Sequence, residues 1–78
     1  MKMSITKLED WVRKLAKTKP YRIMIKNGKG FYEVLFLYTD YHYTDRLYMK
    51  DLDDELTCQK KVLEMCSTFE NNFKLRVF

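Results

Sequence analysis

Glycine and proline are scarce in this chain: its 78 residues contain two glycines and one proline. Disordered chains are rich in proline, glycine and charge and poor in apolar residues, whereas 46% of these residues are hydrophobic, which is typical of a globular protein. No run of 18 apolar residues is present, so no membrane-spanning helix is expected. We therefore expect a soluble, cytoplasmic protein with no membrane partner.

Histidine and cysteine are equally rare, which limits the chemistry that the chain can perform. His42 is the only histidine, so any catalytic arrangement that needs an imidazole would depend on it. Cys58 and Cys66 fall in one predicted helix about 12 Å apart along its axis, too far apart for a disulfide. These three residues also lack the paired spacing of a zinc site.

Two short motifs invite a functional interpretation that their spacing does not support. The acidic run 51–55 has no central glycine and no alternating oxygen ligands, so it predicts a helix start and not a calcium loop. The segment 27–30, Asn-Gly-Lys-Gly, precedes a strand and is too short to hold a phosphate, so it predicts a hairpin turn. We expect no cofactor, no metal and no enzymatic activity.

The predicted elements begin with a helix over residues 5–17. Ile5, Leu8, Val12 and Leu15 recur at steps of three and four residues. Thr6 and Glu9 have the spacing of a capping box, which favours a first turn beginning at Lys7 with Ile5 in a hydrophobic staple. The helix should end before Pro20, because a residue that precedes proline avoids helical angles.

Alternating apolar residues predict three strands, over 21–26, 31–38 and from 41 or 42 to 49, and a fourth over 73–78. A second helix should run from Asp51, its predicted N-cap, to about Glu70. Its predicted apolar stripe consists of Leu52, Leu56, Leu63 and Cys66, with Val62 beside them and Gln59 interrupting it. The order is α-β-β-β-α-β in one α+β domain, with an antiparallel sheet and both helices on one face.

The element order over residues 5–70 resembles that of the double-stranded RNA-binding domain. That family binds phosphates through a basic start to its second helix. Here Asp51, Asp53, Asp54 and Glu55 occupy the corresponding positions, and their charge would repel a phosphate backbone. The resemblance therefore implies the architecture and no binding residues.

Aromatic residues are concentrated in the predicted meander, where all six tyrosines lie between positions 21 and 48. The strand 31–38 is apolar on both faces, yet the two helices shelter only one face of the sheet. These side chains should therefore form either a protein-docking surface, because tyrosine is enriched at interfaces, or an ordinary core with cross-strand aromatic pairs. The candidate protein-binding residues are Tyr32, Phe36, Tyr38, Tyr41 and Tyr43.

Positive charge is concentrated at the start of the chain. Residues 1–30 carry nine Lys/Arg and two Asp/Glu, whereas residues 31–78 carry six and nine. Clusters of this kind either are a solvated polar face or bind phosphate backbones, with neighbouring tyrosines stacking on bases, so nucleic acid is the alternative partner. The candidate nucleic-acid-binding residues are Lys14, Lys17, Lys19, Arg22, Lys26 and Lys29.

The leading functional hypothesis is a small non-catalytic module that binds another protein. Small stand-alone domains rich in Lys, Asn, Ile and Tyr are common among phage and mobile-element accessory proteins. This composition favours an inhibitor or modulator of a host enzyme or defence complex. A domain of this size has little stability margin, so a homodimer formed by pairing of sheet edges is a further alternative.

Overall fold

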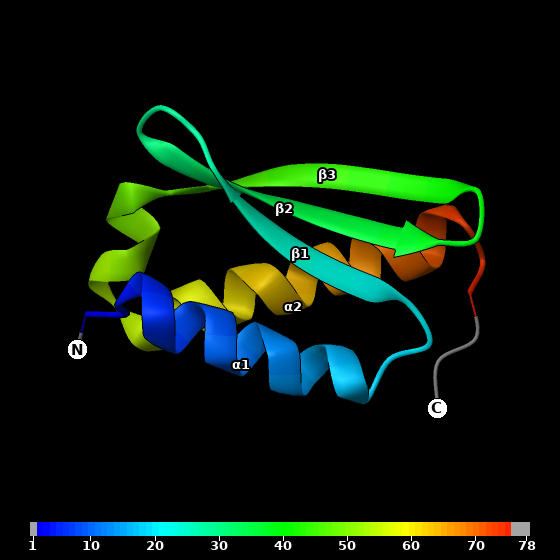
Figure 1. Cartoon of the computed structure of the whole chain (residues 1–78), viewed down its shortest axis with the longest axis horizontal. Helices are drawn as coiled ribbons and strands as arrows, with labels where there is room; N and C mark the ends of the chain where they lie inside the picture. The colour runs from blue at the N-terminus through cyan, green and yellow to red at the C-terminus, as the bar shows by residue number, and fades with distance from the viewer. Residues whose placement is uncertain (1, 76–78) are drawn as a thin grey trace.

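Two helices cover one face of a three-stranded antiparallel sheet in the computed structural model, which describes residues 2–75 (Figure 1). The elements, in chain order, are α1 (Ile5–Lys17), β1 (Arg22–Asn27), β2 (Phe31–Tyr38), β3 (Tyr41–Tyr48), the 3-10 helix η1 (Met49–Asp53) and α2 (Glu55–Asn72). The predicted α+β class and the order α-β-β-β-α are confirmed. Neither α1 nor α2 is long and apolar enough to cross a membrane.

The start of α1 differs from the predicted capping box. Ser4 is the N-cap, and its hydroxyl oxygen accepts a hydrogen bond from the backbone N–H of Lys7 at 3.2 Å. The helix therefore begins at Ile5, and Thr6 lies inside its first turn. At the other end, the Thr18 hydroxyl donates to the Leu15 carbonyl oxygen at 2.7 Å.

The strands form a meander in the order β1-β2-β3. In the first hairpin the backbone N–H of Gly28 donates to the carbonyl oxygen of Phe31 at 2.9 Å. Gly30 has a φ of 74°, in the left-handed region that glycine enters at little cost. A Cβ atom on Gly28 would lie within 3 Å of three ring atoms of Phe31, so this ring packs directly over the glycine.

The predicted N-cap of the second helix, Asp51, is wrong. Asp51 lies in η1 and is buried, whereas Asp54 caps α2 by accepting hydrogen bonds from the Thr57 amide at 3.1 Å and hydroxyl at 2.7 Å. The Asp51 carboxylate instead accepts from the Tyr48 amide at 2.9 Å and from Lys61 at 3.0 Å. This carboxylate joins the end of β3 to the middle of α2.

The predicted apolar stripe of the second helix is also wrong in part. Leu56 and Leu63 are 68% and 45% exposed. Because Leu52 belongs to η1, it does not share the helical phase of α2, and a stripe counted from it points in the wrong direction. The buried face of α2 consists of Cys58, Val62, Met65, Cys66 and Phe69.

The predicted final strand does not begin at Phe73. α2 continues to Asn72, and Phe73 is its C-cap, with its N–H donating to the Phe69 carbonyl at 3.2 Å. Lys74 then has a φ of 53°, and no strand is assigned over 73–75. Residues 76–78 of the predicted strand lie outside the described part of the chain.

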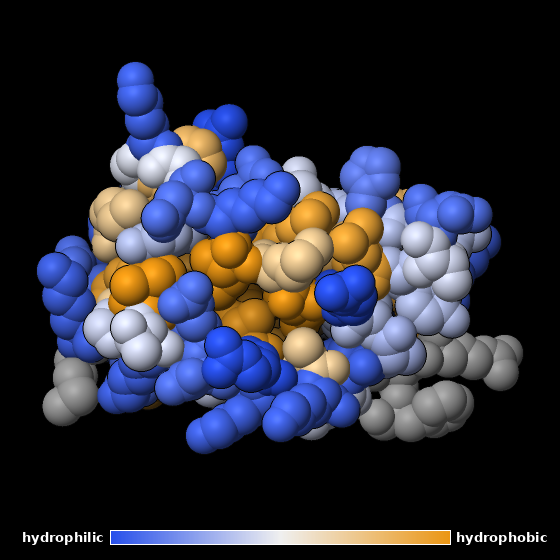
Figure 2. Space-filling model, viewed as in Figure 1, coloured by the Kyte–Doolittle hydropathy of each residue, from blue (hydrophilic) through white to orange (hydrophobic). Residues whose placement is uncertain are grey.

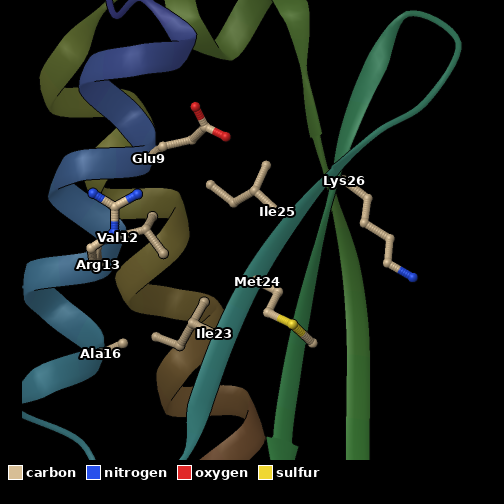
Figure 3. A pocket seen from close by; sticks show the side chains of 8 residues that line it. All are labelled: Glu9, Val12, Arg13, Ala16, Ile23, Met24, Ile25 and Lys26. Atoms are coloured by element: carbon tan, nitrogen blue, oxygen red, sulfur yellow. The ribbon is translucent and has the colours of Figure 1, made fainter.

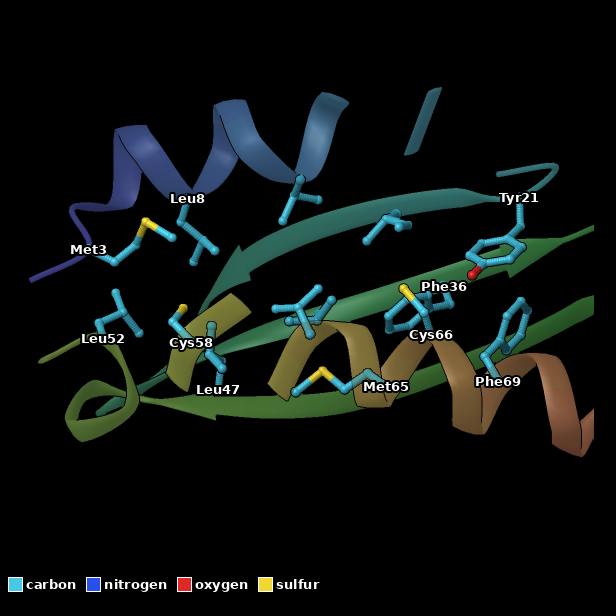
Figure 4. Packing of buried hydrophobic residues seen from close by; sticks show 14 residues of the cluster. Met3, Leu8, Tyr21, Phe36, Leu47, Leu52, Cys58, Met65, Cys66 and Phe69 are labelled. Atoms are coloured by element: carbon cyan, nitrogen blue, oxygen red, sulfur yellow. The ribbon is translucent and has the colours of Figure 1, made fainter. Parts of the chain in front are cut away.

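The hydrophobic core lies between the sheet and the two helices (Figure 4). Tyr21, Phe36 and Phe69 form its aromatic end: ring centroids lie 5.1 Å apart for Tyr21 and Phe69 and 5.6 Å apart for Phe36 and Phe69. Met3, Leu8 and Leu52 pack at the opposite end, next to Cys58. The core is therefore built on the face of the sheet that the helices cover.

A partly buried polar cluster ties the end of α2 to the segment before β1. The Tyr21 hydroxyl donates to the Glu70 carboxylate, and Lys19 Nζ lies 3.0 Å from the same carboxylate. Burial and then the hydrogen bond to Glu70 raise the pKa of Tyr21 well above its ordinary value, so its hydroxyl stays protonated. A second ion pair, between Lys7 and Glu55 at 3.2 Å, links α1 to the start of α2.

Candidate docking surface

The two faces of the sheet differ in what covers them, and strand alternation decides which residues lie on each. In β2, Tyr32, Val34, Phe36 and Tyr38 point toward the helices, since Val34 and Phe36 are fully buried and residues two apart share a face. The alternate β2 residues therefore point away from the helices. We call this side the outer face, and no described element packs over it.

Most of the predicted protein-binding tyrosines lie on the helix-covered side. Phe36 has no exposed surface and belongs to the core, so it is not available to a partner. Tyr32, Tyr38 and Tyr43 are half-buried and pack against that core. The expectation that Phe36 lies on a docking face is therefore corrected.

Tyr43 is held in place from two sides. Its ring lies 5.9 Å from that of Phe36 and 6.3 Å from that of Phe69, and its hydroxyl donates to Asp45 at 3.1 Å. Burial and then the hydrogen bond to Asp45 raise the pKa of Tyr43. These contacts are those of a packed side chain at the margin of the core.

Tyr41 is the most exposed of the five predicted residues, at 46%. Its ring stacks on that of Phe73, with centroids 4.8 Å apart and an angle of 25° between the planes. One face of the ring is thus already occupied by the residue that ends α2. Tyr41 is the one predicted aromatic residue with much surface left for a partner.

The outer face carries an apolar patch that the sequence analysis did not select. Met24 pairs with Leu35 across β1 and β2, and Phe31 pairs with Tyr48 across β2 and β3. None of these side chains packs against the core, and Tyr48 is 42% exposed. We define the outer-face patch as Met24, Phe31, Leu35, Leu37 and Tyr48.

Basic residues lie beside this patch. Arg22 and Lys26 of β1 and Arg46 of β3 share the outer face, with Glu33 between Lys26 and Arg46 in the register. The Arg46 guanidinium lies 4.3 Å from the centre of the Phe31 ring, and Lys61 Nζ lies 5.7 Å from that of Tyr48. The row Lys26, Glu33 and Arg46 therefore divides the patch into Met24, Leu35 and Leu37 on one side and Phe31 and Tyr48 on the other, and it carries more positive than negative charge.

The predicted basic set does not form one surface. Arg22 and Lys26 lie on the outer face, and Lys29 lies in the hairpin loop. Lys14 and Lys17 belong to α1, in the other layer, and Lys19 is paired with Glu70. Arg46 joins the basic residues of the outer face instead, and the two-residue alternation of β3 is the signal that places it there.

A second apolar surface lies along the edge of the sheet. A groove of ≈ 420 Å³ runs between α1 and β1 (Figure 3). Its lining is mostly apolar, with Val12, Ala16, Ile23, Met24 and Ile25, and it also includes the charged Glu9, Arg13 and Lys26. Figure 2 shows hydrophobic surface gathered in the middle of the molecule over this region, bordered by hydrophilic residues. The groove and the outer-face patch meet at β1, where Met24 lines both.

The residues with catalytic or ligating chemistry are dispersed. His42 lies on the outer face, exposed, opposite Leu37. Burial raises the pKa of the Cys58 thiol to about 11, and it also raises the pKa of Cys66, so both thiols are unreactive near neutral pH. Within residues 2–75, no three His, Cys, Asp or Glu side chains gather as a metal site would require.

Comparison of the chain with protein-family models, with curated proteins and with solved structures finds no match. Its function is therefore argued from the two surfaces around β1.

Proposed function

We propose that this chain is a small non-catalytic protein-binding module that docks through the outer face of its sheet. The observation that carries the proposal is the outer-face patch, because an antiparallel sheet that faces water on one side normally carries polar residues there. The patch consists of two half-exposed apolar groups on either side of the row Lys26, Glu33 and Arg46, and apolar area left uncovered on a small domain favours a partner surface.

The composition of the outer face indicates the chemistry of that partner. Leu35, Leu37 and Met24 supply apolar contact area at the centre, and Phe31 and Tyr48 supply aromatic rings, which are enriched at interface centres. Lys26 and Arg46 lie between these two groups, and Arg22 lies beside Leu37. We expect a partner surface that carries acidic residues next to apolar ones.

This assignment replaces the aromatic residues of the covered face with those of the outer face. Of the five predicted residues, only Tyr41, the first residue of β3, is exposed, and it lies on the side of the sheet that the helices cover. An inhibitor or modulator of a host enzyme or defence complex remains the role that the composition favours.

The test is affinity capture from a lysate of the native host with three forms of the purified chain, before and after nuclease treatment. The first is the natural sequence, and the second is Leu35→Asn with Leu37→Asn on the outer face. The third is a matched control, Leu56→Asn with Leu63→Asn, which removes two exposed leucines from α2. Thermal melts of all three forms verify that each is folded.

The proposal requires that the natural chain and the control both capture the same protein and that the outer-face variant does not. Nuclease treatment should leave this capture unchanged. Direct binding of that purified protein should then show the same dependence. Equal capture by the outer-face variant contradicts the proposal.

Nucleic-acid binding is the second candidate, because Arg22, Lys26 and Arg46 share a face with two aromatic rings. Single-strand binders combine positive charge with stacking aromatics in this way. Titration of fluorescent oligonucleotides at low and physiological salt tests it. Binding that weakens steeply with salt and is lost in Arg46→Glu supports this candidate, and no binding at low salt removes it.

A further inference from the structure

The outer edge of β1 has backbone groups that no described strand pairs with. β1 is an edge strand of the sheet, and among the described strands it pairs only with β2. The Gly28 amide donates a hydrogen bond to the Phe31 carbonyl, and these two residues continue the register of β1 and β2. Along an antiparallel ladder, residue pairs that exchange hydrogen bonds alternate with pairs that do not. Arg22, Met24 and Lys26 therefore bond to β2, whereas the N–H and C=O groups of Ile23 and Ile25 point outward.

The groove between α1 and β1 lies directly beside these outward-pointing groups. The side chains of Ile23 and Ile25 line the groove on the β1 side, and Val12 and Ala16 line it on the α1 side (Figure 3). The unpaired backbone and the apolar groove thus occur along the same two residues. A strand added at this edge could use both.

We propose that the edge of β1 binds an extended segment of a partner protein with the pattern acidic, apolar, any residue, apolar, acidic. The inference rests on the proposed protein-binding function and assigns a second contact to it. The segment adds a fourth strand to the sheet. Its apolar side chains enter the groove, and its acidic side chains lie on the outer face.

The spacing of the groove matches this pattern. Val12 and Ala16 are separated by about 6 Å along the helix, and alternate side chains of a strand by about 6.7 Å. Two apolar side chains on one face of the added strand therefore fit beside these two residues.

The charges of β1 select the ends of the motif. Arg22 and Lys26 point to the outer face, and their cross-strand neighbours in an added strand lie on that face too. An acidic residue at each end pairs with one of them. The pattern reads the same in both directions, so it suits an antiparallel or a parallel strand.

A second copy of this chain is a poorer occupant of the same edge. Antiparallel pairing of two β1 strands about a two-fold axis at Met24 would place Arg22 of each copy opposite Lys26 of the other. Like charges directly opposite one another destabilise a strand pair. The occupant is therefore a different, acidic segment.

The experiment uses the isotope-labelled full chain and the blocked synthetic peptide Ser-Glu-Val-Thr-Val-Glu-Ser, followed by amide NMR and hydrogen exchange. Two peptides serve as controls: one carries Lys in place of both Glu, and the other carries Ser in place of both Val. We expect the first peptide to slow exchange at the Ile23 and Ile25 amides. The amides of Met24 and Lys26, already bonded to β2, should change little in exchange rate.

Two sets of variants test the contacts separately. Ala16→Leu fills the groove and should abolish peptide binding, whereas Lys17→Leu, the same residue placed one position along α1, should not. Arg22→Glu with Lys26→Glu should weaken binding of the acidic peptide roughly tenfold and create binding of the Lys peptide.

Each remaining result overturns the inference in a distinguishable way. No shift with any peptide at millimolar concentration removes the edge site, and equal binding of the Ser-for-Val peptide removes the groove. Shifts confined to Leu35 and Leu37 overturn the edge site while supporting the outer-face function. Protection of Ile23 and Ile25 that rises with protein concentration in the absence of peptide identifies a second copy as the occupant.

Discussion

Neighbouring residues of β2 serve opposite purposes, and Phe36 and Leu35 are the clearest pair. Phe36 is fully buried against Tyr21 and Phe69, whereas Leu35 points to the uncovered outer face. Phe36→Ala should lower the free energy of unfolding by about 3–5 kcal/mol, since it leaves a cavity in the core. Leu35→Ala should cost less than about 1 kcal/mol.

Urea denaturation followed by circular dichroism measures both values. The larger loss would unfold a substantial fraction of so small a domain, because its whole stability is of the order of 5–15 kcal/mol or below. Equal losses for the two variants would contradict the assignment of the two faces.

Asp51 is the residue with the clearest pH dependence. Burial alone would raise its pKa, but hydrogen bonds from Lys61 and from the Tyr48 amide outweigh burial and lower the pKa below its ordinary value of 3.8. A carboxyl with a lowered pKa in the folded state stabilises the fold above its ordinary pKa. That stabilisation is lost as the pH falls through the folded value.

Asp51→Asn should therefore lower the free energy of unfolding by about 1–2 kcal/mol at pH 7, because the Lys61 contact loses its charged acceptor. The difference between variant and natural chain should shrink as the pH falls from 5 to 2. Denaturation at a series of pH values measures it. Asp10→Asn, which removes an exposed ion pair with Arg13, is the control and should change stability little at any pH.

At the scale of elements, the start of α1 separates two predictions about capping. Ser4→Ala should destabilise the protein by about 1 kcal/mol, because the Lys7 amide loses its hydrogen-bond acceptor. Thr6→Ala should change stability by less than about 0.5 kcal/mol, since Thr6 is an exposed residue within the first turn. Thermal and urea unfolding of the two variants measure the difference, and a larger effect at Thr6 would restore the capping box.

Elements with a strong local pattern could be predicted from the sequence. The spacing of Ile5, Leu8, Val12 and Leu15 places α1 correctly, and the turn at 27–30 places the first hairpin. The second helix shows why phase is harder to predict. Leu52 and Leu56 look continuous, but the chain changes from 3-10 to α-helix between them, and only the three-dimensional path reveals that break.

The candidate surface was harder to predict than the elements. β2 is apolar on both faces, so its composition does not say which face the helices cover. Val34 and Phe36 settle the question by burial, which depends on packing against α2 and not on local sequence. Arg46 was missed for the same reason, because its place beside Phe31 follows from the register of β3.

For the whole molecule, we expect the charges of β1 to control whether two copies can join. The natural chain should remain monomeric at tens of micromolar in size-exclusion chromatography with light scattering. In a dimer formed by two β1 edges, Arg22 of each copy would lie opposite Lys26 of the other, and the repulsion between these like charges opposes the pairing.

Reversing one of these charges should reverse the outcome. In Arg22→Glu each copy would place a carboxylate opposite Lys26 of the other, so two attractive pairs replace two repulsive ones across the same backbone edge. We expect this variant to dimerise as its concentration rises. If the groove takes part in the dimer, adding Ala16→Leu should abolish dimerisation, and otherwise the double variant should still dimerise. Arg46→Glu removes the same charge from β3, away from this edge, and should stay monomeric. A natural chain that already dimerises, or an Arg22→Glu chain that stays monomeric at millimolar concentration, would show that β1 does not act as an open edge governed by its charges.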